Sequence, residues 1–478
     1  MKKIEYLIVI MLSLVILSFF YNKGVNFADE GYMLHSAQRL YAGELPYKDF
    51  NFIYTPATLY IIAAGYFLFG ESILTGRIIV LLIAVITSLV LYLVTRKLTK
   101  NKFVSLLCVL TYLSWAPTHI SFPLPVMFCL LTGLLSLLIF IKIIDFKKTR
   151  YYFLLGVMVA ITFFIKQNFG IALFFTFTLS FLFFKDLRQR KALWYFAGSF
   201  LGLLCFSLYL LLTDSFFGFI SYSYYALGEY FSRHSIKAPS LFIASSPITS
   251  IIKLGIYLSP LLVSLVAILL SLKSKIKEKS VAICLFVIGY YLVGIYPSTD
   301  YVHISPLLSL LGLPLVVLFV VIKSNNILVI LGLIIIITSG FYTALFKGFY
   351  RWSAPIIDQK YYSNHPRIKI WLNSSDFEKL TIYIQENSSK NDYIYYYLFE
   401  PMFYFITDRR NPIKNLDSFI PSKYQNEEYA KAIESKNTKL IITNMPTSTW
   451  SKSLLPNYIL ENYKTSATIG AYTVWKHK

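Results

Sequence analysis

The chain has 478 residues, is 56% hydrophobic and only 14% charged, and has a mean hydropathy of +0.59. Soluble domains are typically about 45–50% apolar and about 25% charged, so the composition excludes an ordinary soluble enzyme and indicates a membrane protein. The net charge of +21 is spread over short loops, a pattern that argues against a nucleic-acid partner and favours contact with the anionic head groups of membrane lipids.

Apolar segments of about the length needed to cross a bilayer core recur along the first 346 residues. They cover about 4–21, 73–95, 103–115, 123–142, 152–165, 169–184, 192–212, 252–272, 280–296, 304–322 and 327–346. The segments 103–115, 152–165 and 169–184 are short for a span. We therefore expect a polytopic α-helical membrane protein with about eleven transmembrane helices over residues 1–346, the first of them an uncleaved span.

Basic residues gather at every second junction between these segments. Clusters of Lys and Arg follow the spans that end near 95, 142, 184 and 272, whereas the junctions 116–122 and 296–303 contain neither residue. Basic loops stay on the cytoplasmic side of a membrane. The pattern therefore predicts a plasma-membrane protein with a cytoplasmic N-terminus. The loops 22–72 and 214–250 and the residues after 346 are then extracytoplasmic.

The first of these loops, 22–72, opens with NFADEGYMLH and carries an acidic pair. Asp29 and Glu30 are expected in the first turn of a short helix, where the helix dipole favours negative charge, and Gly43 and Pro46 end that helix. An aromatic stretch, YKDFNFIYTP, leads to a second, half-buried helix that begins near Pro56. Acids in a first turn are often simple caps, so a structural role for the pair stays open.

Residues 29–77, from DEGYMLH to ESILTGR, resemble the first outer loop of the GT-C superfamily of polytopic membrane glycosyltransferases. The similarity is to the protein O-mannosyltransferases (glycosyltransferase family 39-like) and to the aminoarabinose transferases that act on lipid A. In these proteins an acidic motif precedes two juxtamembrane helices, and an Arg, matched here by Arg77, opens the second span. The resemblance implies a GT-C-like fold and transfer of a sugar from a polyprenyl-phosphate-linked donor to an envelope glycan, lipid or protein.

The resemblance also implies an inverting single displacement in which Asp29 is the catalytic base and Glu30 orients the acceptor or binds a metal. In such a reaction a cation must stabilise the departing phosphate. Lys166, between two short apolar segments, is placed at membrane depth for this task, and the alternative is a lysine that snorkels to the water. The substrate-binding candidates are Asp49, Lys166, Gln167, Arg233, Asp300 and His303.

The sequence does not decide whether the protein binds a metal ion. Several relatives carry a second acid in the next outer loop, but here that loop, SWAPTHISFPLP, offers His119 and no carboxylate. A divalent metal ion is the one cofactor considered, and the metal ligands are unknown. Asp300 and His303, three residues apart, can share one helical face and contact either a metal or the substrate.

Residues 347–478 are polar and alternate between helix and strand patterns, which predicts a small extracytoplasmic α/β domain. Ser375 and Glu378 have the spacing of a capping box that opens a helix to about 387. Strands are expected at 392–398, at 439–444 and at the end of the chain, and a helix at 425–436. Such a domain either recognises the acceptor or braces the outer loops.

Three classes of function compete. A membrane glycosyltransferase is the first hypothesis, a transporter or flippase of a polyprenyl-linked or envelope substrate is the second, and a non-catalytic scaffold is the third. Transporters place polar groups near the bilayer midplane, whereas here the polar groups gather at the membrane surface and the middles of the spans are nearly free of charge. This distribution favours chemistry at the interface, and a scaffold leaves the acidic pair unexplained.

Overall fold

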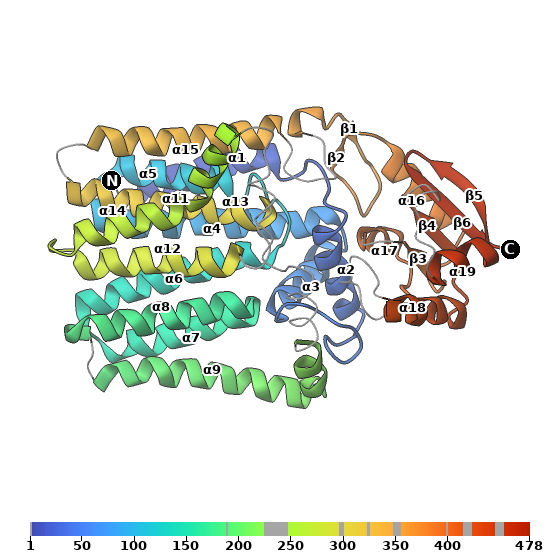
Figure 1. The fold of residues 1–478 in the computed structure, drawn as a ribbon, viewed down its shortest axis with the longest axis horizontal. Coiled ribbons are helices and arrows are strands. Elements are labelled where there is room, and N and C mark those ends of the chain that lie inside the picture. The colour runs from blue at the N-terminus through green and yellow to red at the C-terminus, as the bar shows by residue number, and fades with distance from the viewer. Residues whose placement is uncertain are drawn as a thin grey trace.

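The computed structural model describes residues 2–187, 190–223, 247–295, 301–322, 326–347, 355–397, 400–413, 423–444 and 454–478. A bundle of long helices makes up one part of the molecule and a smaller region of strands and short helices caps one end of it (Figure 1). The helices α2 (Asp29–Tyr41) and α3 (Ala57–Phe69) lie between the two parts. Both helices form where the sequence predicts them.

Each predicted span coincides with a helix of the bundle. The helices are α1 (Lys2–Phe20), α4 (Ile73–Thr99), α5 (Lys102–Trp115), α6 (Pro125–Phe146), α7 (Thr149–Ile165), α8 (Gln167–Phe183), α9 (Leu193–Leu212), α11 (Pro247–Ser271), α12 (Lys277–Ile295), α13 (Tyr301–Leu308) continued by α14 (Gly312–Ile322), and α15 (Asn326–Phe346). Within the described residues, eight spans are long and apolar enough to cross a membrane. The shorter α5, α7 and α8 are the three predicted to be short, so the expected fold class is confirmed.

Small residues let neighbouring helices of the bundle approach closely, as is common in membranes. A Cβ atom on Gly156 of α7 would lie 2.1 Å from the carbonyl oxygen of Tyr195 on α9, and one on Gly198 of α9 would lie 2.3 Å from the carbonyl oxygen of Phe153. The backbones of α7 and α9 are therefore in direct contact, and a larger side chain at either glycine would push them apart.

The C-terminal region contains a four-stranded sheet in the order β3-β4-β6-β5. Its elements are η5 (Ile356–Asp358), β1 (Tyr361–Tyr362), β2 (Trp371–Leu372), α16 (Asp376–Glu386), β3 (Ile394–Tyr396), α17 (Met402–Thr407), α18 (Lys423–Ser435), β4 (Leu440–Thr443), α19 (Leu454–Asn462), β5 (Tyr463–Ile469) and β6 (Tyr472–His477). Strands β3 and β4 are parallel, with Tyr395 opposite Ile441, and β6 is antiparallel to both of its neighbours.

The predicted capping box at the start of α16 is wrong in its detail, although the helix itself forms. The Ser375 side chain makes no cap hydrogen bond, and the Asp376 N–H donates instead to the Ser374 hydroxyl at 3.3 Å. The Glu378 carboxylate accepts a hydrogen bond from the Tyr361 hydroxyl at 2.6 Å, so it is held by the β1 strand.

The loop after the first span and the C-terminal region share a hydrophobic cluster. Phe27, Leu59 and Ile73 from the N-terminal side pack in one cluster with Phe403 and Leu440 from the C-terminal side. Burial of apolar surface stabilises such a joint core in proportion to the area removed from water. The loop 22–72 is therefore fixed from both sides, by the bundle and by the C-terminal region.

Candidate active site

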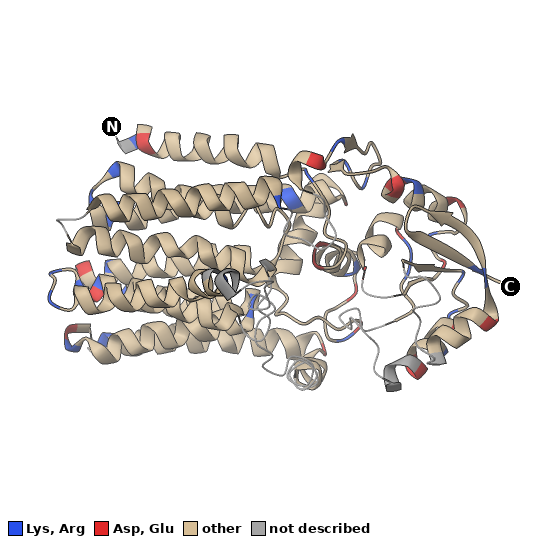
Figure 2. Ribbon diagram, turned by 45° about the horizontal axis from the view of Figure 1, so that its top comes forward, with Lys and Arg blue, Asp and Glu red and all other residues tan. Residues whose placement is uncertain are grey.

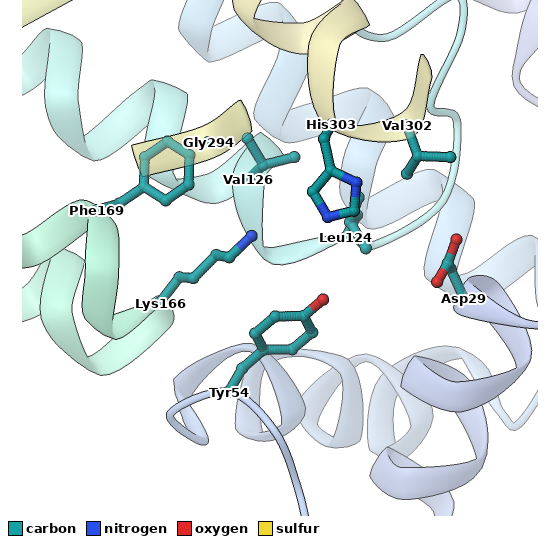
Figure 3. A pocket seen from close by; sticks show the side chains of 9 residues that line it. All are labelled: Asp29, Tyr54, Leu124, Val126, Lys166, Phe169, Gly294, Val302 and His303. Atoms are coloured by element: carbon teal, nitrogen blue, oxygen red, sulfur yellow. The ribbon is translucent and has the colours of Figure 1, made fainter. Parts of the chain in front are cut away.

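A pocket forms where α2, the chain before α3, the α7–α8 turn and α13 meet (Figure 3). It encloses about 320 Å³, part of which is open to solvent. The side chains and backbone around it belong to Asp29, Tyr54, Leu124, Val126, Lys166, Phe169, Gly294, Val302 and His303. Asp29, Lys166 and His303 are widely separated along the chain, so the fold brings together three of the residues predicted from the sequence.

Asp29 is the first residue of α2 and lies at one end of this pocket (Figure 3). Its backbone N–H donates to the Asn26 Oδ1 at 2.7 Å, and Asn26 itself is buried. An Asn side chain that accepts such a bond satisfies a free donor at the start of a helix. The turn that presents Asp29 is therefore locally rigid, while its half-buried carboxylate faces the pocket.

Glu30, the second acid, is fully buried and does not line the pocket. Its Oε1 and Oε2 accept from the Nε and Nη2 of Arg77 at 2.7 and 2.8 Å. Arg77 also donates to the carbonyl oxygens of Lys23 and Gly24, at 3.1 and 2.6 Å. A two-point pair of this kind fixes geometry as well as charge, and here it joins α2 to α4 and to the end of the first span.

Lys166 lies between α7 and α8 and enters the pocket from the side opposite Asp29 (Figure 3). Its Nζ is 5.0 Å from the ring centre of Tyr54 and 5.2 Å from that of Phe169, which are favourable cation–π distances. Only 8% of the residue is exposed. A snorkelling lysine places its ammonium group in water, so this geometry favours the pocket role over snorkelling.

Gln167 and Asn168 hold the walls of the pocket and do not line it. The Gln167 side chain donates to the Ile53 carbonyl oxygen at 3.0 Å and accepts from the Thr55 N–H at 3.3 Å, which fixes the segment that carries Tyr54. The Asn168 Nδ2 donates to the Val293 carbonyl oxygen at 2.9 Å, one residue before Gly294. The Gln167 side chain is thus bound to the backbone beside the pocket, and its contact with substrate stays a prediction.

The other predicted residues are distributed differently. His303, on α13, is half-buried in the pocket, whereas Arg233 and Asp300 lie outside the described residues. Asp49 is exposed and away from the pocket, and its Oδ2 accepts from the Leu45 N–H at 2.7 Å in its own turn. Tyr54, which also lines the pocket, belongs to the aromatic stretch before Pro56, and no sequence pattern distinguishes it from the other aromatic residues there.

The described residues include no group of three His, Cys, Asp or Glu side chains arranged to hold a metal ion. Asp29 and His303 are the two side chains of this kind in the pocket. His119 is buried against the Trp115 ring, at 5.4 Å between ring centres, and does not line the pocket. Burial lowers the pKa of His119 to about 3, so this imidazole is neutral.

Comparison with known proteins agrees with the resemblance found in the first loop. Residues 54–211 match the family described as dolichyl-phosphate-mannose-protein mannosyltransferase. No curated protein matches the sequence. The crystal structure of ArnT from Cupriavidus metallidurans bound to undecaprenyl phosphate matches with a TM-score of 0.62 and 12% identity, over 98% of this chain and 97% of that chain. Its apo state matches with a TM-score of 0.58 and 13% identity over the same shares.

These comparisons confirm the fold over nearly the whole chain. The family match lies on the segment that runs from Tyr54 of the pocket to α9, and the structural match extends the same architecture to the C-terminal region. The chain therefore has the multi-pass membrane fold of the ArnT structures, and the family match over residues 54–211 bears out the hypothesis of a glycosyltransferase.

Proposed function

We propose that this GT-C glycosyltransferase moves a sugar from a polyprenyl-phosphate-linked donor to an acceptor of the cell envelope, at the extracytoplasmic face of the membrane. The observation that carries the proposal is the pocket itself, in which the Asp29 carboxylate and the Lys166 ammonium group face each other from opposite ends. The bound undecaprenyl phosphate in the structure of the ArnT relative supports a polyprenyl-phosphate donor.

The arrangement suits an inverting single displacement at the anomeric carbon. Asp29, as general base, takes the proton of the acceptor hydroxyl as that oxygen attacks the sugar. On the opposite side of the sugar the bond to the donor phosphate breaks, and Lys166 stabilises the charge that the phosphate gains in a site shielded from bulk water. His303 and the Tyr54 hydroxyl, between the two ends in the view of Figure 3, contact the sugar or the phosphate.

The two acids have different roles in this proposal. Asp29 acts on the acceptor, and Glu30, through Arg77, holds the helix that carries Asp29. A buried carboxylate with both oxygens held by an arginine is costly to break, because an unpaired charge would be left in the interior. A divalent metal ion would have Asp29 and His303 as its protein ligands among the described residues of the pocket.

The orientation of the chain in the membrane also belongs to the proposal. Lys and Arg gather at the end of the bundle that is remote from the pocket and from the C-terminal region (Figure 2). Basic loops remain cytoplasmic. The pocket then opens at the extracytoplasmic surface, where lipid-linked sugars and envelope acceptors meet.

Lipid-linked sugar profiling of a strain that lacks the protein tests the proposal. The donor should accumulate in that strain and should be consumed again when the wild-type protein is restored. Asp29→Asn should fail to consume it, since loss of a general base typically costs about 10²–10⁴-fold in rate. Asp49→Asn is the matched control, because Asp49 is an exposed acid of the same loop outside the pocket. Consumption by Asp29→Asn within a few-fold of the wild type would falsify the assignment of the base.

A further inference from the structure

The turn that carries Asp29 is in contact with the C-terminal region as well as with the bundle. The Met402 N–H, at the start of α17, donates to the Phe27 carbonyl oxygen at 3.2 Å. The Phe27 ring contacts both Phe403, stacked at 5.8 Å, and Phe377, edge-on at 4.8 Å. Phe27 is only two residues before Asp29, so any movement of α17 is transmitted to the base over a very short stretch of chain.

Gly31, two residues after Asp29, brings the backbone of α2 directly against α17. A Cβ atom at Gly31 would lie 2.2 Å from the backbone nitrogen of Met402 and 2.6 Å from its Cα. Both atoms belong to the backbone, so a side-chain rotation cannot relieve such an overlap. The absence of a side chain at residue 31 is therefore what allows α17 to rest on α2.

A polar network fixes the same two elements farther along α2. The Gln38 Nε2 donates to Glu71 and to Asp408, each at 3.0 Å. Arg367 forms ion pairs with the same two acids, at 3.1 and 3.2 Å. Asp408 directly follows α17, so the network fixes the C-terminal end of α17 beside α2.

The start of α17 is fixed within the C-terminal region by Glu400, which is buried and two residues before Met402. Its Oε1 accepts from the Asn444 Nδ2 at 2.9 Å, and its Oε2 accepts from the Tyr472 hydroxyl at 3.5 Å. Asn444 follows β4 and Tyr472 begins β6. A continuous path of contacts thus leads from the sheet through α17 to the turn of Asp29.

We infer that α17 is a positioning element for the reaction: by holding Phe27 and Gly31 it sets the place of the Asp29 carboxylate in the pocket. This inference rests on the proposed function of Asp29. It assigns the C-terminal region a direct part in catalysis through Asp29, in addition to any contact with the acceptor. Displacement of a catalytic group by about 1 Å costs on the order of 10²-fold in rate, so small shifts of α17 matter.

The test uses the full-length protein and compares Gly31→Ala with Gly156→Ala. Both changes place a Cβ atom at about the same short distance from the backbone, 2.2 Å at Gly31 and 2.1 Å at Gly156, but Gly156 lies between α7 and α9. Turnover is measured per folded molecule on the lipid-linked sugars that accumulate in the deletion strain, and binding is measured with undecaprenyl phosphate. Gly31→Ala should lower turnover about 10²-fold and leave binding within about twofold. Gly156→Ala, whose overlap lies between α7 and α9 and does not touch the turn of Asp29, should lower turnover far less.

Phe403→Leu serves as the second variant, since it weakens the ring stack from the α17 side and leaves α2 unchanged. If Gly31→Ala does not accumulate as folded protein, the turnover of Phe403→Leu decides whether α17 positions Asp29. Wild-type turnover per folded molecule in the variants that fold would overturn the inference. The base assignment would survive that result if Asp29→Asn is inactive. If Asp29→Asn is itself active, the proposed function fails first, and the two failures are thereby distinguished.

Discussion

At the scale of single residues, five of the six positions 26–31 carry contacts that fix the first loop. Asn26 accepts the N–H of Asp29, Phe27 docks on α17, Asp29 faces the pocket, Glu30 binds Arg77, and Gly31 allows α17 to approach. Adjacent side chains on a helix point about 100° apart, because a turn takes 3.6 residues. Two neighbouring acids therefore face different surroundings, one in the pocket and one in the core.

The role of Lys166 can be separated from that of a structural cation by three substitutions. Lys166→Ala should lower turnover about 10²-fold while donor affinity falls only a few-fold, because the phosphate gains charge in the transition state. Lys166→Arg should recover part of the rate, since Arg keeps the charge with a different geometry. Lys166→Gln should remain slow. Turnover and affinity are measured for all three variants, and a Gln variant that behaves as the wild type would rule out the phosphate contact.

At the scale of elements, the site is held by helix ends and turns. The turn between α7 and α8 sends three consecutive side chains to three different elements: Lys166 to the pocket, Gln167 to residues 53–55, and Asn168 to the end of α12. The short helix α17 supports the site from the C-terminal side, through its contacts with Phe27 and Gly31. Catalytic groups need such supports, because a loosely held base loses most of its effect on the rate.

The buried carboxyl of Glu400, just before α17, predicts a dependence of stability on pH. Burial raises the pKa of Glu400 from its ordinary value of 4.5 to about 7. The folded protein therefore holds this proton more tightly than the unfolded chain does. The resulting stability is complete below pH 4.5 and is lost as the pH rises through 7, by on the order of 3 kcal/mol.

Glu400→Gln removes this titration, because the amide stays neutral. The variant should melt at a higher temperature than the wild type at pH 8, and its advantage should shrink as the pH falls to 5. The difference between the two melting temperatures across pH 5–8 isolates Glu400 from the other titrating groups. A difference that is independent of pH would show that the carboxyl does not titrate in this window.

At the scale of the whole molecule, the Lys and Arg residues of the bundle gather at the end that is remote from the C-terminal region (Figure 2). Two acids at this end are paired with lysines, Asp145 with Lys279 at 2.6 Å and Glu5 with Lys102 at 2.7 Å. The end that carries the pocket is covered by α2, α3 and the C-terminal region.

The orientation predicts where the C-terminus lies. A reporter that is active only outside the cytoplasm, fused after Lys478, should give a signal, and a reporter active only in the cytoplasm should not. The physical basis is the retention of basic loops on the cytoplasmic side. The reverse outcome would place the pocket in the cytoplasm and would contradict transfer at the extracytoplasmic face.

The sequence by itself determined the features that depend on composition and on neighbours along the chain. Hydrophobic length predicted every span of the bundle, and local patterns predicted α2, α3 and the strand β4. The resemblance of the first loop to GT-C enzymes suggested a class of enzyme with which the family match over residues 54–211 agrees. These features are local, because a span or a helix end is specified by the residues within it.

Only the tertiary structure decided which residues share a site. It placed Asp29, Lys166 and His303 around one pocket, assigned Glu30 to Arg77, and left Asp49 at the surface. It also brought Met402 against Gly31, a contact between residues 371 positions apart in the sequence. Such pairings are set by the packing of whole elements, and that packing minimises exposed apolar surface over the entire chain, so no local pattern encodes them.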